Sequence, residues 1–381
     1  MNKCEQFLKQ TKPTMQRFKA LDVFRGMTIC LMIIVNTPGT WSAVYAPFLH
    51  APWHGFTPTD LVFPSFLFAV GNAFAFVKSR WTDKTLSDVF GKILKRTFLI
   101  FLIGYLLSWF PFVRWNDAGE LYFKGIETTR IFGVLQRIAL CYFGAAILIF
   151  YLNKRQLLIA SGIILFGYWG LMYGFGDYSL ENNYARTLDR ILLGDNHLYK
   201  GEGIPFDPEG ILSTFPGIVN VIGGYLAGAY IIMGKTITYE KVAKLLLYGC
   251  LLMGLAYVWD LGFPINKKIW TSSYVLLTVG INLVTLAGLI YLIDFKPRPM
   301  SFKFFEVFGM NSLFIYILSG FLVKLMLLIK INGESAYGFI YKNGFEWMGG
   351  KLGSFMFALV FLLVCWIVGR FLDKRKIYIR V

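Results

Sequence analysis

Apolar stretches of about 20 residues recur along almost the whole chain, and this recurrence limits what the chain can fold into more than any other feature. A helix needs roughly 20 apolar residues to cross about 30 Å of hydrocarbon. Such stretches cover residues 20–36, 60–77, 97–113, 131–152, 157–175, 210–233, 242–260, 271–293, 304–329 and 352–371. The pattern predicts an all-α polytopic membrane protein, folded as a single bundle of about ten or eleven transmembrane helices.

The composition supports one membrane domain. Of the 381 residues, 56% are hydrophobic and only 16% are charged, which is more apolar surface than one soluble core can hide. No linker of biased composition divides the chain. We therefore expect a transmembrane domain over residues 20–371, between a cytoplasmic N-terminal tail (1–19) and a basic cytoplasmic tail (372–381). Within it, Gly224 and Gly228 have the spacing of closely packed membrane helices.

The positive charge of the chain is distributed as in a membrane protein. The net charge is +16, but Lys and Arg cluster between the apolar stretches, so we do not expect nucleic acid as a partner. The loops on alternate sides carry 24 and 11 of these residues, and the side with 24 includes both tails. Because basic loops face the cytoplasm, both termini are expected there, with anionic lipid as their neighbour.

The expected location is a bacterial inner membrane. The sequence contains no Asn-x-Ser/Thr sequon and no cysteine in any predicted outer loop, so neither glycosylation nor a disulfide framework is indicated. The first apolar stretch lacks a small-residue cleavage site, and we therefore do not expect a removable signal peptide.

Two arginines lie within predicted spans, where a charge is costly. Arg25 is near the start of the first span and Arg137 is inside the fourth. Such residues usually face a bundle interior and mark a functional path, and a guanidinium suits phosphate. Two inward-facing arginines can hold an anionic cofactor. The alternative is a snorkelling side chain or an internal ion pair, for example between Arg25 and Asp22.

All three histidines fall on the predicted outer side. His50 and His54 lie in the loop 37–59, which has no Lys or Arg but is rich in Pro, Gly and Trp. This loop is expected to fold back onto the mouth of the bundle and to form a site. A structural plug is the alternative. A metal site is not expected, because Pro52 disfavours the helix that the spacing of the two histidines needs.

Eight short blocks, in consistent order along nearly the whole chain, resemble the transmembrane acetyltransferase family typified by the lysosomal heparan-α-glucosaminide N-acetyltransferase, together with its bacterial relatives. They read LDVFRG (21–26), VN (35–36), HAPWHG (50–55), DLVFP (60–64), GVLQR (133–137), LDRILLGDNHLY (188–199), FDPEGILST (206–214) and FGMNS (308–312). The long luminal N-terminal portion of the lysosomal enzyme has no counterpart in these blocks, which leaves the acceptor open.

The resemblance implies acetyl transfer from cytosolic acetyl-CoA to an amino sugar on the far side of the membrane. In the family motif the active-site histidine corresponds to His50 and a functional asparagine to Asn36. His50 suits the role of general base, or it carries the acetyl group transiently. Asn36 is expected to donate to the oxyanion. Asp60 either fixes the tautomer of His50 or caps the second span.

The remaining expected roles concern the two substrates. The cofactor path is expected to include Arg25, Gln136, Arg137, Asn311 and Ser312, and the acceptor site Trp53, His54, His197, Asp207 and Glu209. For His197, Asp207 and Glu209 a network that orders the outer loop is an equal alternative.

Two other functions fit the same sequence. One is a transporter for a sugar or cell-wall fragment, although we find no internal repeat. The other is an O-acyltransferase acting on an extracytoplasmic polysaccharide. A homodimer is expected by analogy alone.

Overall fold

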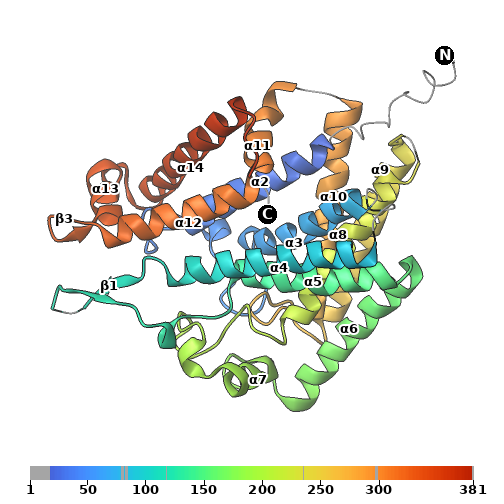
Figure 1. The fold of residues 1–381 in the computed structure, drawn as a ribbon, viewed down its shortest axis with the longest axis horizontal. Helices are drawn as coiled ribbons and strands as arrows, with labels where there is room; N and C mark the ends of the chain where they lie inside the picture. The colour runs from blue at the N-terminus through green and yellow to red at the C-terminus, as the bar shows by residue number, and fades with distance from the viewer. Residues whose placement is uncertain are drawn as a thin grey trace.

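The computed structural model describes residues 18–78, 81, 85–116, 118–234, 236–296 and 299–379. These residues form a bundle of helices with two short antiparallel hairpins at its edge (Figure 1). The hairpins pair β1 (Val113–Trp115) with β2 (Leu121–Phe123), and β3 (Lys330–Ile331) with β4 (Glu334–Ser335).

The helices follow the apolar stretches of the sequence. They are α2 (Lys19–Asn36), α3 (Val62–Lys78), α4 (Leu86–Trp109), α5 (Val134–Tyr151), α6 (Lys154–Phe175), α7 (Tyr184–Leu193), α8 (Thr214–Ile232), α9 (Tyr239–Asp260), α10 (Ser272–Ile290), α11 (Pro299–Met310), α12 (Ser312–Leu328), α13 (Ala336–Gly344) and α14 (Gly350–Lys374). Short helical turns are η1 (Ala46–Phe48), η2 (Pro58–Leu61), η3 (Ile126–Thr128), η4 (Asp195–His197), η5 (Tyr291–Phe295) and η6 (Glu346–Met348).

Seven of the described helices are long and apolar enough to cross a membrane, and α11 with α12 makes an eighth if this bent pair counts as one span. The chain is therefore an all-α polytopic membrane protein, as the sequence predicts. The predicted ten segments also include α2 and α4. Both have the length of a span but carry more charged residues, such as Asp22 and Arg25 in α2 and Lys95 and Arg96 in α4.

Two predicted segments differ most from the structure. The third begins at Leu86 rather than at residue 97, because Thr85 caps the helix through the backbone N–H of Asp88 and the charged first turns remain helical. The ninth is not one straight helix. It is interrupted at Asn311, where α11 and α12 meet at 83°.

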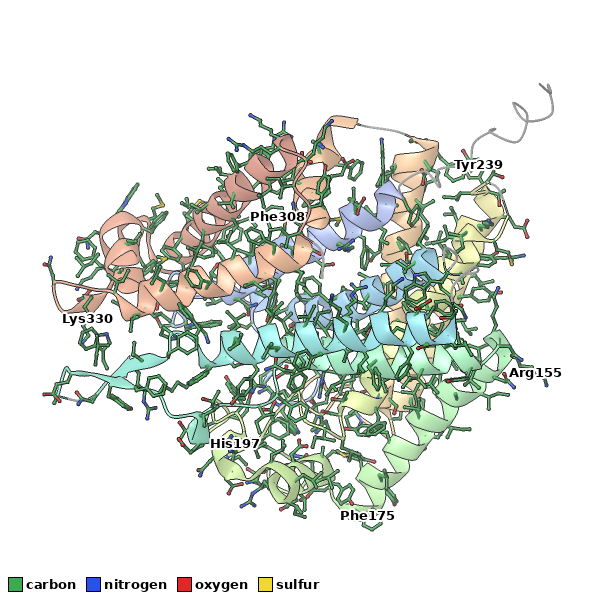
Figure 2. All side chains as sticks on the ribbon, in the orientation of Figure 1. Arg155, Phe175, His197, Tyr239, Phe308 and Lys330 are labelled. Atoms are coloured by element: carbon green, nitrogen blue, oxygen red, sulfur yellow. The ribbon has the colours of Figure 1, made fainter. Side chains whose placement is uncertain are left out.

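Three of the predicted loops can be placed along the long axis of the bundle. Arg155 and Tyr239, from loops assigned to one side, lie toward one end of the long axis, and Lys330, assigned to the other side, lies at the opposite end (Figure 2). For these three loops the placement agrees with the predicted alternation. Which end faces the cytoplasm stays a prediction from the charge count.

Helices α3 and α8 pack with their backbones in contact. A Cβ added to Gly224 would overlap the carbonyl oxygen of Phe68, and one added to Gly71 would overlap the carbonyl of Val221. A Cβ at Gly228 would lie 2.8 Å from the carbonyl oxygen of Asn72. The glycines therefore serve close helix packing, as their spacing predicts, and this pair of helices forms the centre of the apolar core.

We expect Gly224→Ala to destabilise the protein by about 1–3 kcal/mol, because the added methyl group meets a carbonyl that is fixed within α3. The measurement is thermal unfolding in detergent. The matched control is Gly167→Ala in α6, where a Cβ meets nothing within 4 Å. This control should leave the protein as stable or slightly more stable, and equal unfolding temperatures for the two variants would contradict the packing argument.

Candidate active site

The loop between α2 and α3 is held against the bundle by its own turns and by distant backbone. The Thr57 hydroxyl donates to the carbonyl of Leu49 at 2.7 Å, and the N–H of Gly55 donates to the carbonyl of Ile265 at 2.8 Å. At its start, Thr40 and Ser354 of α14 exchange hydrogen bonds. The loop is therefore a fixed part of the fold and not a flexible tether, which is what a site requires.

His50 and Asp60 form a pair within this loop. The Nδ1 atom of His50 lies 2.6 Å from Oδ1 of Asp60. The carboxylate is 1% exposed, whereas 42% of the imidazole is accessible. Because an ionised carboxylate only accepts hydrogen bonds, this contact assigns the proton to Nδ1 and leaves Nε2 as the basic nitrogen.

The second oxygen of Asp60 organises the chain around the pair. Its Oδ2 accepts from the backbone N–H of Thr57 at 2.9 Å and of Ala51 at 3.2 Å. Thr57 and Asp60 form a capping box at the start of η2, directly before α3. Asp60 thus contacts His50 and caps the helix at the same time, so the two roles weighed from the sequence do not exclude each other.

Lys267 contacts His50, although the sequence did not single it out. It comes from the loop between α9 and α10, and its Nζ lies 3.0 Å from Nε2 and 3.2 Å from Nδ1 of His50. An atom in the ring plane at these two distances would collide with Cε1, so the ammonium lies over the face of the imidazole. Burial lowers the pKa of Lys267, against the opposing attraction of Asp60 and Glu209.

The loop that carries Lys267 is tightly fixed. The side-chain oxygen of Asn266 accepts hydrogen bonds from the backbone N–H groups of Lys268 and Ile269. Trp270 is fully buried with φ of +51°, a conformation that costs a bulky residue energy, and its indole N–H donates to Asn220 at 3.0 Å. The surrounding packing therefore imposes the backbone that directs Lys267 toward His50.

A second charged cluster lies beside this loop. Arg130 donates to both oxygens of Asp207, from Nε at 2.8 Å and from Nη2 at 2.5 Å, and also to Glu209. Burial alone would raise the pKa of Glu209, but Arg130, Arg137 and Lys267 outweigh it and hold the pKa below its usual value. Arg130 itself was not predicted, because the sequence shows it only as one more charge in an outer loop.

The contacts of Arg137 place it at the end of the bundle that holds the Arg130 cluster. It is fully buried in the first turn of α5, and its Nη2 donates to the carbonyl of Gly210 at 3.1 Å and to the Ser213 hydroxyl. The guanidinium lies 4.9 Å from the centre of the Trp270 ring. Its Nε and Nη1 have no hydrogen-bond partner among the described residues. Next to it, the Gln136 amide donates to the carbonyl of Ile131 at 3.0 Å.

Arg25, Asn311 and Ser312 form a separate group. Arg25 donates to the Ser312 hydroxyl at 2.9 Å and lies 3.8 Å from Asp22. Asn311 donates to the carbonyl of Ile377 and accepts from the N–H of Ile379, so it holds the C-terminal segment. Arg25 and Asn36 are both on α2, about 16 Å apart at 1.5 Å per residue. The expected cofactor residues are thus divided between two levels of the bundle.

The remaining predicted residues lie at the end of α2 and in loops between the helices. Asn36 is exposed and ends α2, which contacts η2. The Trp53 indole donates to the carbonyl of Tyr178 at 2.7 Å, and Nδ1 of His54 lies 3.4 Å from Nδ2 of Asn266. Burial lowers the pKa of His54. His197 lies at the edge of the bundle (Figure 2), with Nδ1 2.9 Å from the carbonyl oxygen of Thr129.

Comparison with known proteins gives one consistent result. Residues 17–194 match the family described as heparan-alpha-glucosaminide N-acetyltransferase, catalytic. The human heparan-alpha-glucosaminide N-acetyltransferase is 31% identical over 358 residues, covering 79% of this chain and 52% of the human protein. The mouse protein of the same name is 29% identical, with 79% and 53% covered. The chain spans about half the length of these relatives.

We expect Arg130→Met to destabilise the protein by about 3 kcal/mol, because it removes the cation that contacts the buried carboxylates of Asp207 and Glu209 directly. Thermal unfolding in detergent measures the effect. The control is Arg190→Met, which removes the exposed pair with Asp195 and should change little. If Arg130→Met unfolds at the temperature of the control, the cluster does not hold the outer loops together.

Proposed function

Because the chain belongs to the heparan-α-glucosaminide N-acetyltransferase family, we propose that it transfers an acetyl group from acetyl-CoA to the amine of a glucosamine-type sugar. The observation that carries the proposal is the His50–Asp60 pair, in which a buried carboxylate orients an accessible imidazole. No feature of the described residues favours a transporter over this reaction. The O-acyltransferase alternative uses the same pair and differs only in its acceptor.

In the proposed reaction His50 acts as general base. Its Nε2 takes a proton from the acceptor amine as the nitrogen attacks the thioester carbon, and it returns the proton to the sulfur of the leaving group. The carboxylate of Asp60 keeps the ring in this tautomer and stabilises the imidazolium that forms. Asn36 donates its side-chain N–H to the oxyanion. We favour this direct transfer over a covalent acetyl-imidazole.

Two groups of residues would meet acetyl-CoA in this scheme. The Arg25 guanidinium and the Ser312 hydroxyl lie together and offer donors for phosphate oxygens. Nearer His50, the unpartnered Nε and Nη1 of Arg137 are buried donors that need an acceptor, and Gln136 is its neighbour. We therefore propose that Arg25, Asn311 and Ser312 define the entry of the cofactor, and that Gln136 and Arg137 lie nearer the acetyl group.

The acceptor is proposed to bind among the outer loops. Trp53 offers an aromatic face of the kind that sugars stack on, and His54 and His197 offer hydrogen bonds. Glu209 is an acidic group that, after Asp60, favours the protonated form of Lys267. Asp207 would act indirectly, through Arg130, with which it forms two hydrogen bonds. We place His50 on the periplasmic side of a bacterial inner membrane, with both termini in the cytoplasm.

His50→Ala should lower kcat for acetyl transfer by at least about 10³-fold while binding of CoA stays measurable, because only the base is removed. The assay follows label from acetyl-CoA into a panel of amino sugars and polysaccharides, with the purified full chain. Asp60→Asn should lower kcat by about 10²-fold or more, since an amide can hold the wrong tautomer. Normal turnover by His50→Ala would contradict the proposed mechanism. Label that appears only on hydroxyl groups of the acceptors would favour the O-acyltransferase.

A cysteine introduced at Ser42 should react with a membrane-impermeant maleimide added outside intact cells, because the loop 37–59 is proposed to face the periplasm and Ser42 is exposed. The matched variant is Ser87→Cys at the exposed start of α4, which should react only after the membrane is opened. The reverse pattern would overturn the orientation and, with it, the proposed direction of transfer.

A further inference from the structure

Lys267 places a positive charge against the base of the proposed reaction. Its Nζ lies over the imidazole face, at 3.0 Å from Nε2, whereas Nδ1 is already bonded in the ring plane to Asp60. The in-plane lone pair of Nε2 therefore points away from Lys267. The ammonium leaves the basic nitrogen free for a proton and yet stays next to it.

The position of Lys267 is close to where negative charge must form. A nitrogen that gives its proton to Nε2 has to lie within about 3 Å of that atom, and the carbonyl carbon that it attacks is a bond length further on. An ammonium that contacts the same Nε2 is then within a few ångströms of the carbonyl oxygen. A fixed cation aimed at a developing oxyanion is among the strongest sources of catalysis.

We propose that Lys267 is a further catalytic residue of this site, and that its ammonium stabilises the negative charge on the acetyl carbonyl oxygen when the acceptor attacks. The inference rests on the acetyl transfer proposed above. The acceptor nitrogen forms its bond to the carbonyl carbon, and the electron pair of the C=O bond moves to the oxygen facing Lys267. That pair returns as the C–S bond breaks, and the thiolate takes the proton from His50. Lys267 keeps its own protons throughout.

The surroundings of Lys267 support a charged and fixed group. Asp60, from the start of α3, and Glu209, from the loop before α8, both favour its protonated form, while Lys268 and Arg137 oppose it. The loop that carries Lys267 is held by the hydrogen bond from the N–H of Lys268 to the side chain of Asn266, and Trp270 within it has a left-handed backbone conformation. A lysine that served only to neutralise Asp60 would not need to lie over the His50 ring, since three hydrogen bonds already pair both oxygens of that carboxylate.

The test compares Lys267→Met with wild type and with Lys342→Met. The first removes the charge with little change in length, and the second removes an outer lysine that pairs with Glu334 in an exposed position. We expect Lys267→Met to lower kcat by about 10²–10³-fold, with KM for acetyl-CoA within two-fold of wild type. Lys342→Met should match wild type. A kcat for folded Lys267→Met within three-fold of wild type overturns the inference.

A second variant separates catalysis from folding. Lys267→Cys, made in a chain with Cys4 and Cys250 replaced by Ser, should be as slow as the Met variant and should regain at least about ten-fold in kcat when 2-bromoethylamine rebuilds an ammonium on the sulfur. Failure to regain activity in the fully alkylated protein would contradict the role. If His50→Ala is inactive while Lys267→Met is fully active, only this inference fails. If wild type transfers no acetyl group to any acceptor, the proposed function itself fails.

Discussion

A carboxylate buried at the start of a membrane helix is stable only if every one of its oxygens is paired, and Asp60 meets this condition. One oxygen holds His50, and the other holds Thr57 and the backbone N–H of Ala51. The Tyr274 hydroxyl, from α10, donates to the backbone carbonyl of the same residue at 2.6 Å. The loop 37–59, the beginning of α3 and the beginning of α10 are thus joined at one point, and the imidazole is oriented by the same contacts that fix the fold.

Part of this arrangement was predictable because it is local in the chain. The apolar stretches determine the spans, since hydrocarbon leaves the backbone no alternative to a helix. His50 and Asp60 are ten residues apart, so a loop closed by a capping box brings them together. Sequence alone also indicated that Gly224 and Gly228 pack against a neighbouring helix, because small residues four apart have few other roles in a membrane.

The rest depended on contacts between distant segments. Lys267 lies 217 positions from His50, and in an outer loop it reads only as a contribution to the charge balance. Arg130 was hidden for the same reason. Arg137 was expected well inside the fourth span, on one cofactor path with Arg25, but α5 begins at Val134, which places Arg137 in the first turn of its helix. A shift of one helical turn at the start of a span therefore changes which partners a residue can reach.

The large separation between Lys267 and His50 has a consequence for how the protein is made. During synthesis the chain enters the membrane from its N-terminus, so the His50–Asp60 pair can assemble once α3 is inserted. Lys267 arrives only after six further helices have emerged (α4 to α9). A chain arrested midway would hold the His50–Asp60 pair without Lys267. All three side chains would come together only in a protein whose later helices have been inserted and packed.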